Sequence, residues 1–164
     1  MAGSSKKRVR AHPQVNDIDL STLDALVGYC LRRALAKQRE RFRAVFGRFG
    51  IRPVQFAVLV LIRDSMPVRQ AELGRAIEMK RANVVTVLDE LIESGLVTRQ
   101  QAHDDRRSNV VSLTPKGIAF TDKLLVQHGK LERDLGKHLG KRELARLVQL
   151  LKAFRQLDSD PDLD

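Results

Sequence analysis

Apolar side chains return every three or four positions in the first third of the chain, between residues 23 and 35 and again between residues 42 and 49. This spacing predicts one long first helix, which Gly47 and Gly50 weaken and end. Four residues can cap its start: Asp17, Asp19, Ser21 and Thr22. A nearly all-round apolar segment, residues 53–62, then predicts a buried second helix with a proline in its first turn.

The middle of the chain carries a helix–turn–helix pattern followed by two short strands. Residues 70–78 predict a short helix, and residues 80–94 predict a longer one that Gly95 ends. The inward stripe of the longer helix consists of Val84, Val87, Leu88, Leu91 and Ile92. Residues 96–101 and 109–114 predict strands, and the polar loop HDDRRS joins them. This order of elements is the layout of a winged helix-turn-helix DNA reader.

Two helices are predicted after the strands. Thr114 can cap the first of them and Pro115 suits its first position, while Gly129, Gly136 and Gly140 make it loose. Residues 141–157 predict a last helix with one strongly apolar face, which is typical of core or of a dimer contact.

Composition and charge narrow the classes of function. The chain of 164 residues suits one domain with a core, 43% of the residues are hydrophobic and only 4% are aromatic. The formal charge of +10 and the pI of about 10.4 favour a polyanionic partner, although a basic protein without one is the simpler alternative. One cysteine excludes an internal disulfide and fits a cytoplasmic location. We expect no membrane contact, because no apolar run approaches ~20 residues and no secretory signal is present.

The stretch from residue 70 to residue 117 resembles the MarR family of transcriptional regulators. The run "DRR…VSLTPKG" at its distance behind "GLVTR" carries the resemblance, and "GYCLRRAL" at 28–35 and "IRPVQFAVLVLI" at 51–62 extend it outward. The matching residues are Leu91, Gly95, Leu96, Val97, Arg99, Asp105, Arg106, Arg107, Val111, Ser112, Leu113, Thr114, Lys116 and Gly117. The resemblance covers nearly the whole chain apart from about fifteen residues at the start and a few at the end.

The resemblance implies a mainly α fold with a small β-wing, in which N- and C-terminal helices form a homodimer. We therefore expect a flexible basic arm at 1–16, a first helix with a possible effector site at 17–52, and a DNA-binding lobe at 53–114. C-terminal dimerisation helices at 115–158 and an acidic tail at 159–164 complete the expected organisation. The basic arm can touch DNA phosphates, fold over a ligand, or serve only as a solubilising tail.

The outer, N-terminal side of the longer helix is the predicted base-reading surface. Arg81 can pair with guanine and Asn83 with adenine, Thr86 can meet a thymine methyl group or a phosphate, and Lys80 suits a phosphate. In the preceding helix, Arg69, Gln70 and Arg75 are candidate backbone contacts, although Arg75 can equally pair with Glu72 or Glu78. The simpler alternative for all of these side chains is a polar face in water.

The wing loop carries the remaining predicted DNA contacts. By resemblance, Arg107 or Arg106 inserts into the minor groove and Asp105 orients it through an ion pair. A narrow minor groove has enhanced negative potential, which suits an arginine there. A floppy charged hairpin loop is the alternative.

Eight basic residues and one acid lie between residues 31 and 52. Arginine binds carboxylate and phosphate through its planar fork, so this segment predicts an anion site near the dimer interface. The basic residues are Arg32, Arg33, Lys37, Arg39, Arg41, Arg43, Arg48 and Arg52. We expect Arg39, Arg43, Phe46 and Arg48 to bind a small acidic effector, an aromatic carboxylate or its acyl-coenzyme A (acyl-CoA) thioester. A solvated face that draws the protein to DNA is the alternative.

Other classes of function find little support. The four histidines, His12, His103, His128 and His138, have no partner at metal-ligand or triad spacing, and no glycine-rich phosphate loop is present, so we expect no enzyme and no cofactor. A thiol redox sensor that uses Cys30 is an alternative, although a lone cysteine in an apolar stripe is usually a small core residue. A basic architectural protein that binds DNA without sequence preference is another. We expect a repressor acting at an inverted repeat, and activation is the open alternative.

Overall fold

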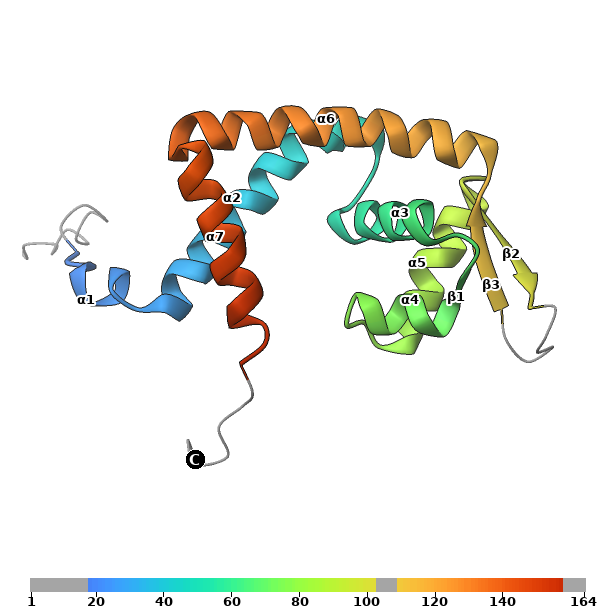
Figure 1. Cartoon of the computed structure of the whole chain (residues 1–164), viewed down its shortest axis with the longest axis horizontal. Helices are drawn as coiled ribbons and strands as arrows, with labels where there is room; N and C mark the ends of the chain where they lie inside the picture. Colours follow the sequence, from blue (N-terminus) through green and yellow to red (C-terminus); the bar gives the residue numbers. More distant parts are fainter. Residues whose placement is uncertain (1–17, 103–108, 158–164) are drawn as a thin grey trace, which may run out of the picture. The chain divides into compact units, whose positions relative to one another are not determined.

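The computed structural model describes residues 18–102 and 109–157 (Figure 1). It confirms a mainly helical chain with a small antiparallel sheet. The chain divides into two compact units, with the boundary between Glu40 and Arg41. The helix α2 (Val27–Phe46) begins in the first unit and ends in the second. The predicted basic arm and acidic tail lie outside the described residues.

The first unit contains a break that the sequence pattern did not predict. A one-turn helix α1 (Ser21–Asp24) is followed by two non-helical residues before α2 begins, so the prediction of one continuous first helix is wrong here. Helix α1 buries none of its residues, and therefore no packing holds it in line with α2. The Cys30 thiol donates to the Asp24 carbonyl oxygen at 3.1 Å and satisfies an acceptor at the break.

The core of the second unit lies where α3 (Pro53–Ser65), α4 (Gln70–Ala76) and α5 (Arg81–Glu93) meet. Val58, Leu59 and Ile62 of α3 are fully buried, as the apolar segment predicts. The helix pair α4–α5 confirms the predicted helix–turn–helix. Gly95 has a φ of 68°, which is the left-handed conformation that ends α5.

The wing contains three strands instead of the two that the sequence predicts. Strands β2 (Val97–Gln101) and β3 (Asn109–Leu113) pair antiparallel, and β1 (Val68–Arg69) pairs with the other edge of β3. The strand order is therefore β1-β3-β2. Because β1 has two residues, it is too short to show a strand period in the sequence.

Two helices complete the second unit. Helix α6 (Pro115–Leu139) is continuous through Gly129 and Gly136 and ends at Gly140, which has a φ of 89°. Helix α7 (Lys141–Phe154) follows and buries none of its residues. Among the described residues, no single helix is long and apolar enough to cross a membrane; only residues 27–49 taken with α3 have the length and composition, and that pair is bent by 72°.

A tight junction joins the end of α5 to the start of α6. The Thr114 hydroxyl accepts from the Gly117 amide at 2.9 Å and donates to the Gly95 carbonyl at 2.8 Å, which confirms the predicted cap. Lys116 Nζ donates to the Ser94 carbonyl at 2.7 Å. A Cβ atom at Gly117 would overlap the Leu96 carbonyl oxygen, so only glycine permits this approach. The junction explains why "GLVTR" and "LTPKG" occur together.

Candidate nucleic-acid interface

Helix α5 has a buried face and an exposed face. Val84, Val87, Leu88 and Leu91 are buried, as predicted, and the fifth residue of the stripe, Ile92, is half-buried. On the other side, the candidate contacts Arg81, Asn83 and Thr86 are exposed, and so is Lys80, the N-cap residue directly before α5. The apolar packing therefore presents the predicted base-reading side chains to solvent together.

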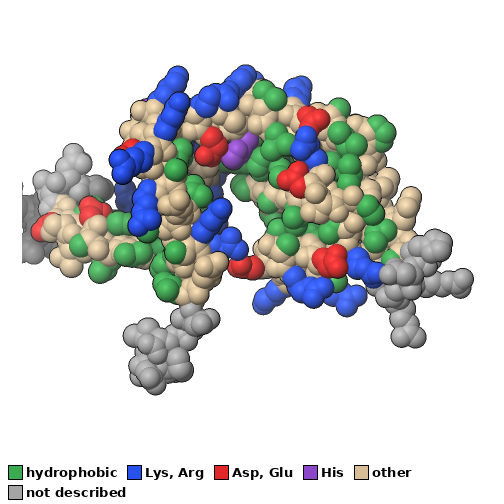
Figure 2. All heavy atoms as spheres, in the orientation of Figure 1, with side chains coloured by type: hydrophobic (Ala, Val, Ile, Leu, Met, Phe, Trp, Pro, Cys, Tyr) green, Lys and Arg blue, Asp and Glu red, His purple; other side chains and the backbone are tan. Residues whose placement is uncertain are grey.

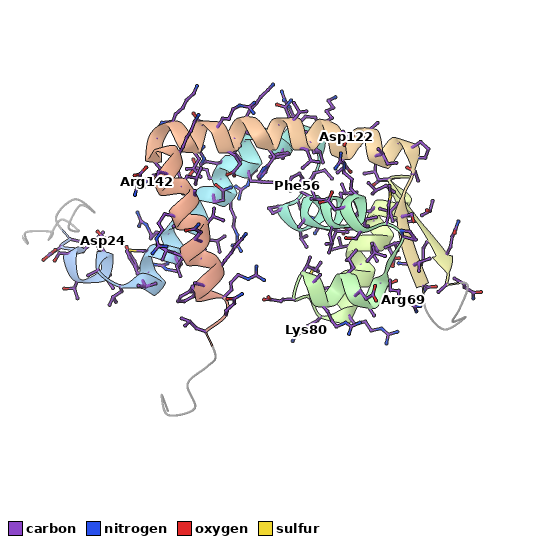
Figure 3. The ribbon with its side chains drawn as sticks, viewed as in Figure 1. Asp24, Phe56, Arg69, Lys80, Asp122 and Arg142 are labelled. Atoms are coloured by element: carbon purple, nitrogen blue, oxygen red, sulfur yellow. The ribbon has the colours of Figure 1, made fainter. Side chains whose placement is uncertain are left out.

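A hollow of about 680 Å³ lies beside these side chains. It is lined by Arg69 of β1 and by residues of α4, of the turn and of the first turn of α5. The basic and amide side chains from these elements are Gln70, Arg75, Lys80 and Arg81, and the acids are Glu72 and Glu78. Figure 2 shows a row of Lys and Arg side chains along this edge of the lobe, and Figure 3 places Arg69 and Lys80 on it. Five of the predicted DNA contacts thus share one basic concave surface.

Individual contacts refine the predicted roles. Thr86 Oγ1 donates to the Ala82 carbonyl of its own helix at 3.2 Å, so the hydroxyl is engaged within α5. The amide oxygen of Gln70 is buried without a hydrogen-bond partner in the described part of the chain. Glu78, in the left-handed conformation at φ 53°, accepts from Arg155 at 2.9 Å.

The base of the wing is fixed to α5. Arg99 of β2 donates to Asp89 of α5 at 2.8 Å, with the arginine side chain 28% exposed. The strands therefore follow α5 in orientation. The predicted minor-groove contacts Asp105, Arg106 and Arg107 lie outside the described residues.

A second hollow, of about 430 Å³, lies between α3, the end of α4 and α6. It is mostly apolar, with Asp64 and His128 as its polar side chains. The imidazole of His128 stacks on the ring of Phe56, with the ring centroids 5.1 Å apart and the two planes inclined by 20°. The sequence offers no signal for this position of His128, because the contact with α3 joins residues far apart in the chain.

The predicted effector residues lie on α2 and just after it. Arg39, in the first unit, and Arg43 are exposed. Arg48 donates to Gln127 Oε1 at 3.3 Å, and its guanidinium lies over the Phe49 ring at 4.8 Å. Phe46 is fully buried, with its ring centroid 5.4 Å from that of Phe56. Phe46 therefore packs behind the wall of the second hollow instead of lining it.

Two carboxylates away from these hollows have hydrogen-bond partners that shift their pKa. Arg41 Nη2 donates to Asp134 Oδ2 at 2.8 Å, and this hydrogen bond lowers the pKa of the Asp134 carboxyl. The backbone amide of Ser21 likewise lowers the pKa of Asp19. Within residues 18–102 and 109–157, no group of three or more His, Cys, Asp or Glu side chains could hold a metal ion. Cys30 is exposed and not part of a core in the described chain, contrary to the usual role of such a residue.

Comparison with known proteins places the chain among transcriptional regulators. The model of the MarR family matches residues 51–109. The uncharacterised HTH-type transcriptional regulator YkoM of Bacillus subtilis is 32% identical over 103 residues, which are 63% of this chain and 67% of YkoM.

Solved structures of similar proteins cover more of the chain. The transcriptional repressor CouR bound to a DNA duplex is 30% identical with a TM-score of 0.78, over 85% of this chain and 99% of CouR. A second structure of CouR holds p-coumaroyl-CoA, with 27% identity and a TM-score of 0.78 over 87% and 100% of the two chains. BpsR of Bordetella bronchiseptica, whose DNA binding is regulated by 6-hydroxynicotinic acid, is 25% identical with a TM-score of 0.77 over 82% and 96%.

Proposed function

The chain belongs to the MarR family of DNA-binding transcriptional regulators, and from this membership we propose that it is a homodimeric repressor without catalytic activity, acting in the cytoplasm. It binds an inverted repeat and leaves it when a small acidic effector binds. The observation that carries the DNA-binding part is the basic concave surface formed by α4, the turn and the start of α5.

In the proposed complex, α5 enters the major groove with its N-terminal residues at the base edges. Arg81 and Asn83 read guanine and adenine, and Lys80 binds a phosphate next to the positive end of the helix dipole. Because the Thr86 hydroxyl is engaged with Ala82, its methyl group is the part that meets a thymine. Arg69, Gln70 and Arg75 hold the DNA backbone on the other side of the hollow.

The wing contributes the remaining contacts of the proposed complex. Arg106 or Arg107 enters the minor groove and Asp105 orients it. The described base of the wing supports this role, because the Arg99–Asp89 ion pair ties the strands to the helix in the major groove. The wing and α5 then approach the DNA as one rigid unit.

Exposed apolar side chains support the proposed dimer. In α7 and just beyond it, Leu147, Val148, Leu150, Leu151, Phe154 and Leu157 are 38–71% exposed. In the first unit, Ile18, Leu23, Leu26, Val27 and Leu35 are 41–62% exposed. Clusters of this kind on a chain of this size mark a protein–protein contact. Residues 17–52 and 115–158 thus form the dimer, and two copies of the lobe at 53–114 read half-sites about one DNA turn apart.

The effector we propose is an aromatic carboxylate or its acyl-CoA thioester. The second hollow has the size of small-ligand pockets, and the Phe56–His128 stack gives it an aromatic wall. CouR and BpsR bind molecules of these two kinds. Arg43 and Arg48 bind the acidic groups, and Phe46 supports the wall from behind. An effector contact of Arg39 stays a prediction from the sequence. The effector binds better to a conformation in which the spacing of the two DNA-binding lobes does not match the spacing of the operator half-sites.

The test of DNA binding is a fluorescence-polarisation titration of DNA from the region upstream of the gene, at several salt concentrations. A repressor of this kind binds one inverted repeat far more tightly than a scrambled duplex of the same length at each salt concentration. Equal affinity for both duplexes, with a steep salt dependence, would instead establish the architectural alternative.

The test of the effector repeats the titration with aromatic acids and with their CoA thioesters. Release by the thioester but not by the free acid assigns the arginines to the phosphates, and a variant with Arg43→Gln and Arg48→Gln then loses that response. Release by the free acid assigns the ligand to the hollow, and Phe56→Ala weakens it. Arg142→Gln removes a positive charge from α7 and serves as the control.

The exposure of Cys30 keeps the redox alternative testable in the same assay. If no acid or thioester acts, the operator complex is treated with hydrogen peroxide. Loss of binding that Cys30→Ser prevents would replace the acidic effector by oxidation of this thiol.

A further inference from the structure

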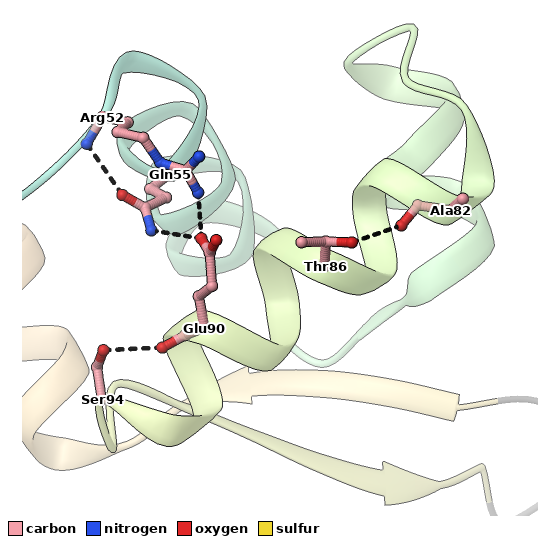
Figure 4. A network of polar contacts seen from close by, with 6 residues as sticks. All are labelled: Arg52, Gln55, Ala82, Thr86, Glu90 and Ser94. Atoms are coloured by element: carbon pink, nitrogen blue, oxygen red, sulfur yellow. Dashed lines mark hydrogen bonds and ion pairs between the residues drawn. The ribbon is translucent and has the colours of Figure 1, made fainter.

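A polar cluster connects the N-terminus of α3 to the C-terminal half of α5 (Figure 4). The backbone amide of Arg52 donates to Gln55 Oε1 at 2.9 Å, and Gln55 Nε2 donates to Glu90 Oε2 at 2.9 Å. The Arg52 guanidinium donates to the same carboxylate oxygen. Gln55 is 8% exposed, and its amide is the link between the two charged side chains. Arg52, Gln55 and Glu90 are called the α3–α5 clamp below.

The clamp differs in kind from the contacts around it. Apart from Gln55, the buried residues of the two helices are all apolar, among them Leu59 and Leu88, which are fully buried. Apolar contact is non-directional, whereas a hydrogen bond requires a defined distance and angle. The apolar core therefore holds α3 and α5 together, and the clamp fixes the rotation of α5 against α3.

The clamp lies at a point where a rotation matters. Glu90 is nine residues after Arg81, which is about 13 Å along the helix. Asp89 accepts from Arg99 of the wing, and the carbonyl of Ser94, directly after α5, accepts from Lys116 of α6. Together with the clamp to α3, these contacts hold the C-terminal end of α5 against three elements. In the N-terminal half of α5, Val84 and Val87 are packed in the core, and among the described residues no side chain of this half makes a hydrogen bond to another element. A small change at Glu90 is therefore expected to act on the orientation of this half.

The clamp also adjoins the second hollow. Phe56, which follows Gln55 in α3, lines that hollow and stacks on His128. Two residues before Arg52 in the sequence, Gly50 has a φ of 65° and ends the turn that follows α2. In the first turn of α3, Phe56 thus faces the hollow and its neighbour Gln55 faces α5.

We propose that Gln55 and Glu90 are positioning residues that set the angle of α5 and thereby the half-site spacing that the dimer accepts. This inference rests on the proposed function, because spacing has meaning only for a dimer on an inverted repeat. Neither residue touches DNA in the proposed complex. Both act through the orientation of Arg81 and Asn83.

The experiment compares Glu90→Ala and Gln55→Met with the wild type. The control Glu93→Ala removes an exposed carboxylate from the same helix. The DNA is an inverted repeat selected by the wild-type protein from a random pool, together with versions that have one base pair added or removed between the half-sites. The readout is the ratio of dissociation constants for altered and original spacing.

We expect the wild type and Glu93→Ala to share a large ratio, and Glu90→Ala and Gln55→Met to lower it by roughly fivefold or more, within the usual range of coupling between sites. The double variant is no worse than either single one, because both changes break the same clamp. A purely structural role would weaken binding by one factor at every spacing. That outcome, or an unchanged ratio, overturns the proposal.

Hydrogen exchange of the free protein provides a test that needs no operator. In Glu90→Ala, the α5 amides exchange faster than in the wild type and in Glu93→Ala, while those of α6 are unchanged. Equal exchange in all three proteins overturns the clamp. If the wild type selects no sequence but exchange accelerates in Glu90→Ala, the clamp stands as an orienting device and the proposed function fails.

Discussion

Helices α5 and α7 have similar lengths, 13 and 14 residues, and both carry an apolar stripe, yet within the described part of the chain only α5 has buried side chains. Leu88 of α5 is fully buried, whereas Leu150 of α7 is 51% exposed. Burying a leucine side chain contributes about 1.5–3 kcal/mol. The difference shows that α5 draws its stability from packing within one chain, whereas for α7 we expect that stability to come from the second chain of the proposed dimer.

The largest effect is expected for Leu88→Ala, which deletes a buried side chain from α5. We expect the free energy of unfolding to fall by about 2–5 kcal/mol, from lost burial and the cavity left behind. Urea unfolding at several protein concentrations measures this, and the loss is the same at each concentration. The same change in α7, Leu150→Ala, is the matched control; an equal loss there at high dilution would contradict the contrast between the helices.

A smaller effect is expected on the exposed side of α5. Arg81→Ala weakens operator binding by about 1–3 kcal/mol and relaxes the preference at one base pair, because a two-hydrogen-bond contact is lost. Arg107→Ala in the wing weakens binding within the same range. Arg142→Ala on α7 removes the same charge and leaves the sequence preference unchanged. Unchanged affinity of Arg81→Ala or Arg107→Ala would exclude the corresponding contact.

Because the apolar face of α7 is exposed, we expect a substitution on it to weaken dimer association and to leave the fold of the single chain intact. Leu150→Ala raises the dimer dissociation constant about tenfold, which is the range of a central interface side chain. Sedimentation equilibrium measures it, and Lys152→Ala, on the same exposed helix, is the control. A chain that remains a monomer in the wild type at all concentrations would refute the role of α7.

The junction between α5 and α6 gives an effect of about 1 kcal/mol. Thr114→Ala removes the hydroxyl that caps α6 and holds the Gly95 carbonyl, and the free energy of unfolding falls by that amount. Thermal unfolding measures it against Thr22→Ala in α1, an exposed threonine of the first unit. No difference between the two variants would show that the cap is redundant.

The smallest effect concerns pH and the ion pair of α6 with α2. Because the Arg41 hydrogen bond lowers the pKa of Asp134 below the usual 3.8, the pair stabilises the folded chain above that pH. Its contribution is lost as the pH falls through the lowered value. The Asp134→Asn variant should lack the drop in stability that this pair causes at low pH, whereas the Asp64→Asn variant should still show that drop. Identical acid transitions in the wild type and Asp134→Asn would contradict the pairing.

The sequence predicted what depends on local chemistry. Gly95, Thr114 and Pro115 each demand a particular backbone conformation, so the ends of α5 and the start of α6 could be located from residue types alone. The break after α1 could not, because it reflects missing packing, and β1 exists only by pairing with β3. Gln55 and Glu90 meet across 35 positions, and no local pattern reports such a contact.

The candidate site divides in the same way. The exposed side of α5 follows directly from its apolar period, so the sequence alone predicts that Arg81 and Asn83 are exposed, and their contact with DNA stays a prediction. The arginine-rich segment around Phe46 predicts an effector contact for that residue, yet its ring is covered by an aromatic neighbour from α3. His128 gains its place beside Phe56 only through the packing of α6 on α3.

The close approach of Gly117 to Leu96 turns α6 into a lever. Helix α6 is 25 residues long, about 37 Å, and its first turn has no freedom against the end of α5. A tilt of about 5° at the fulcrum would swing the far end by roughly 3 Å, more than half a helical turn. Conversely, a restraint on the C-terminal end of α6 would limit the orientation of α5 to a range of a few degrees. The absence of a Cβ atom at Gly117 is what permits this close junction.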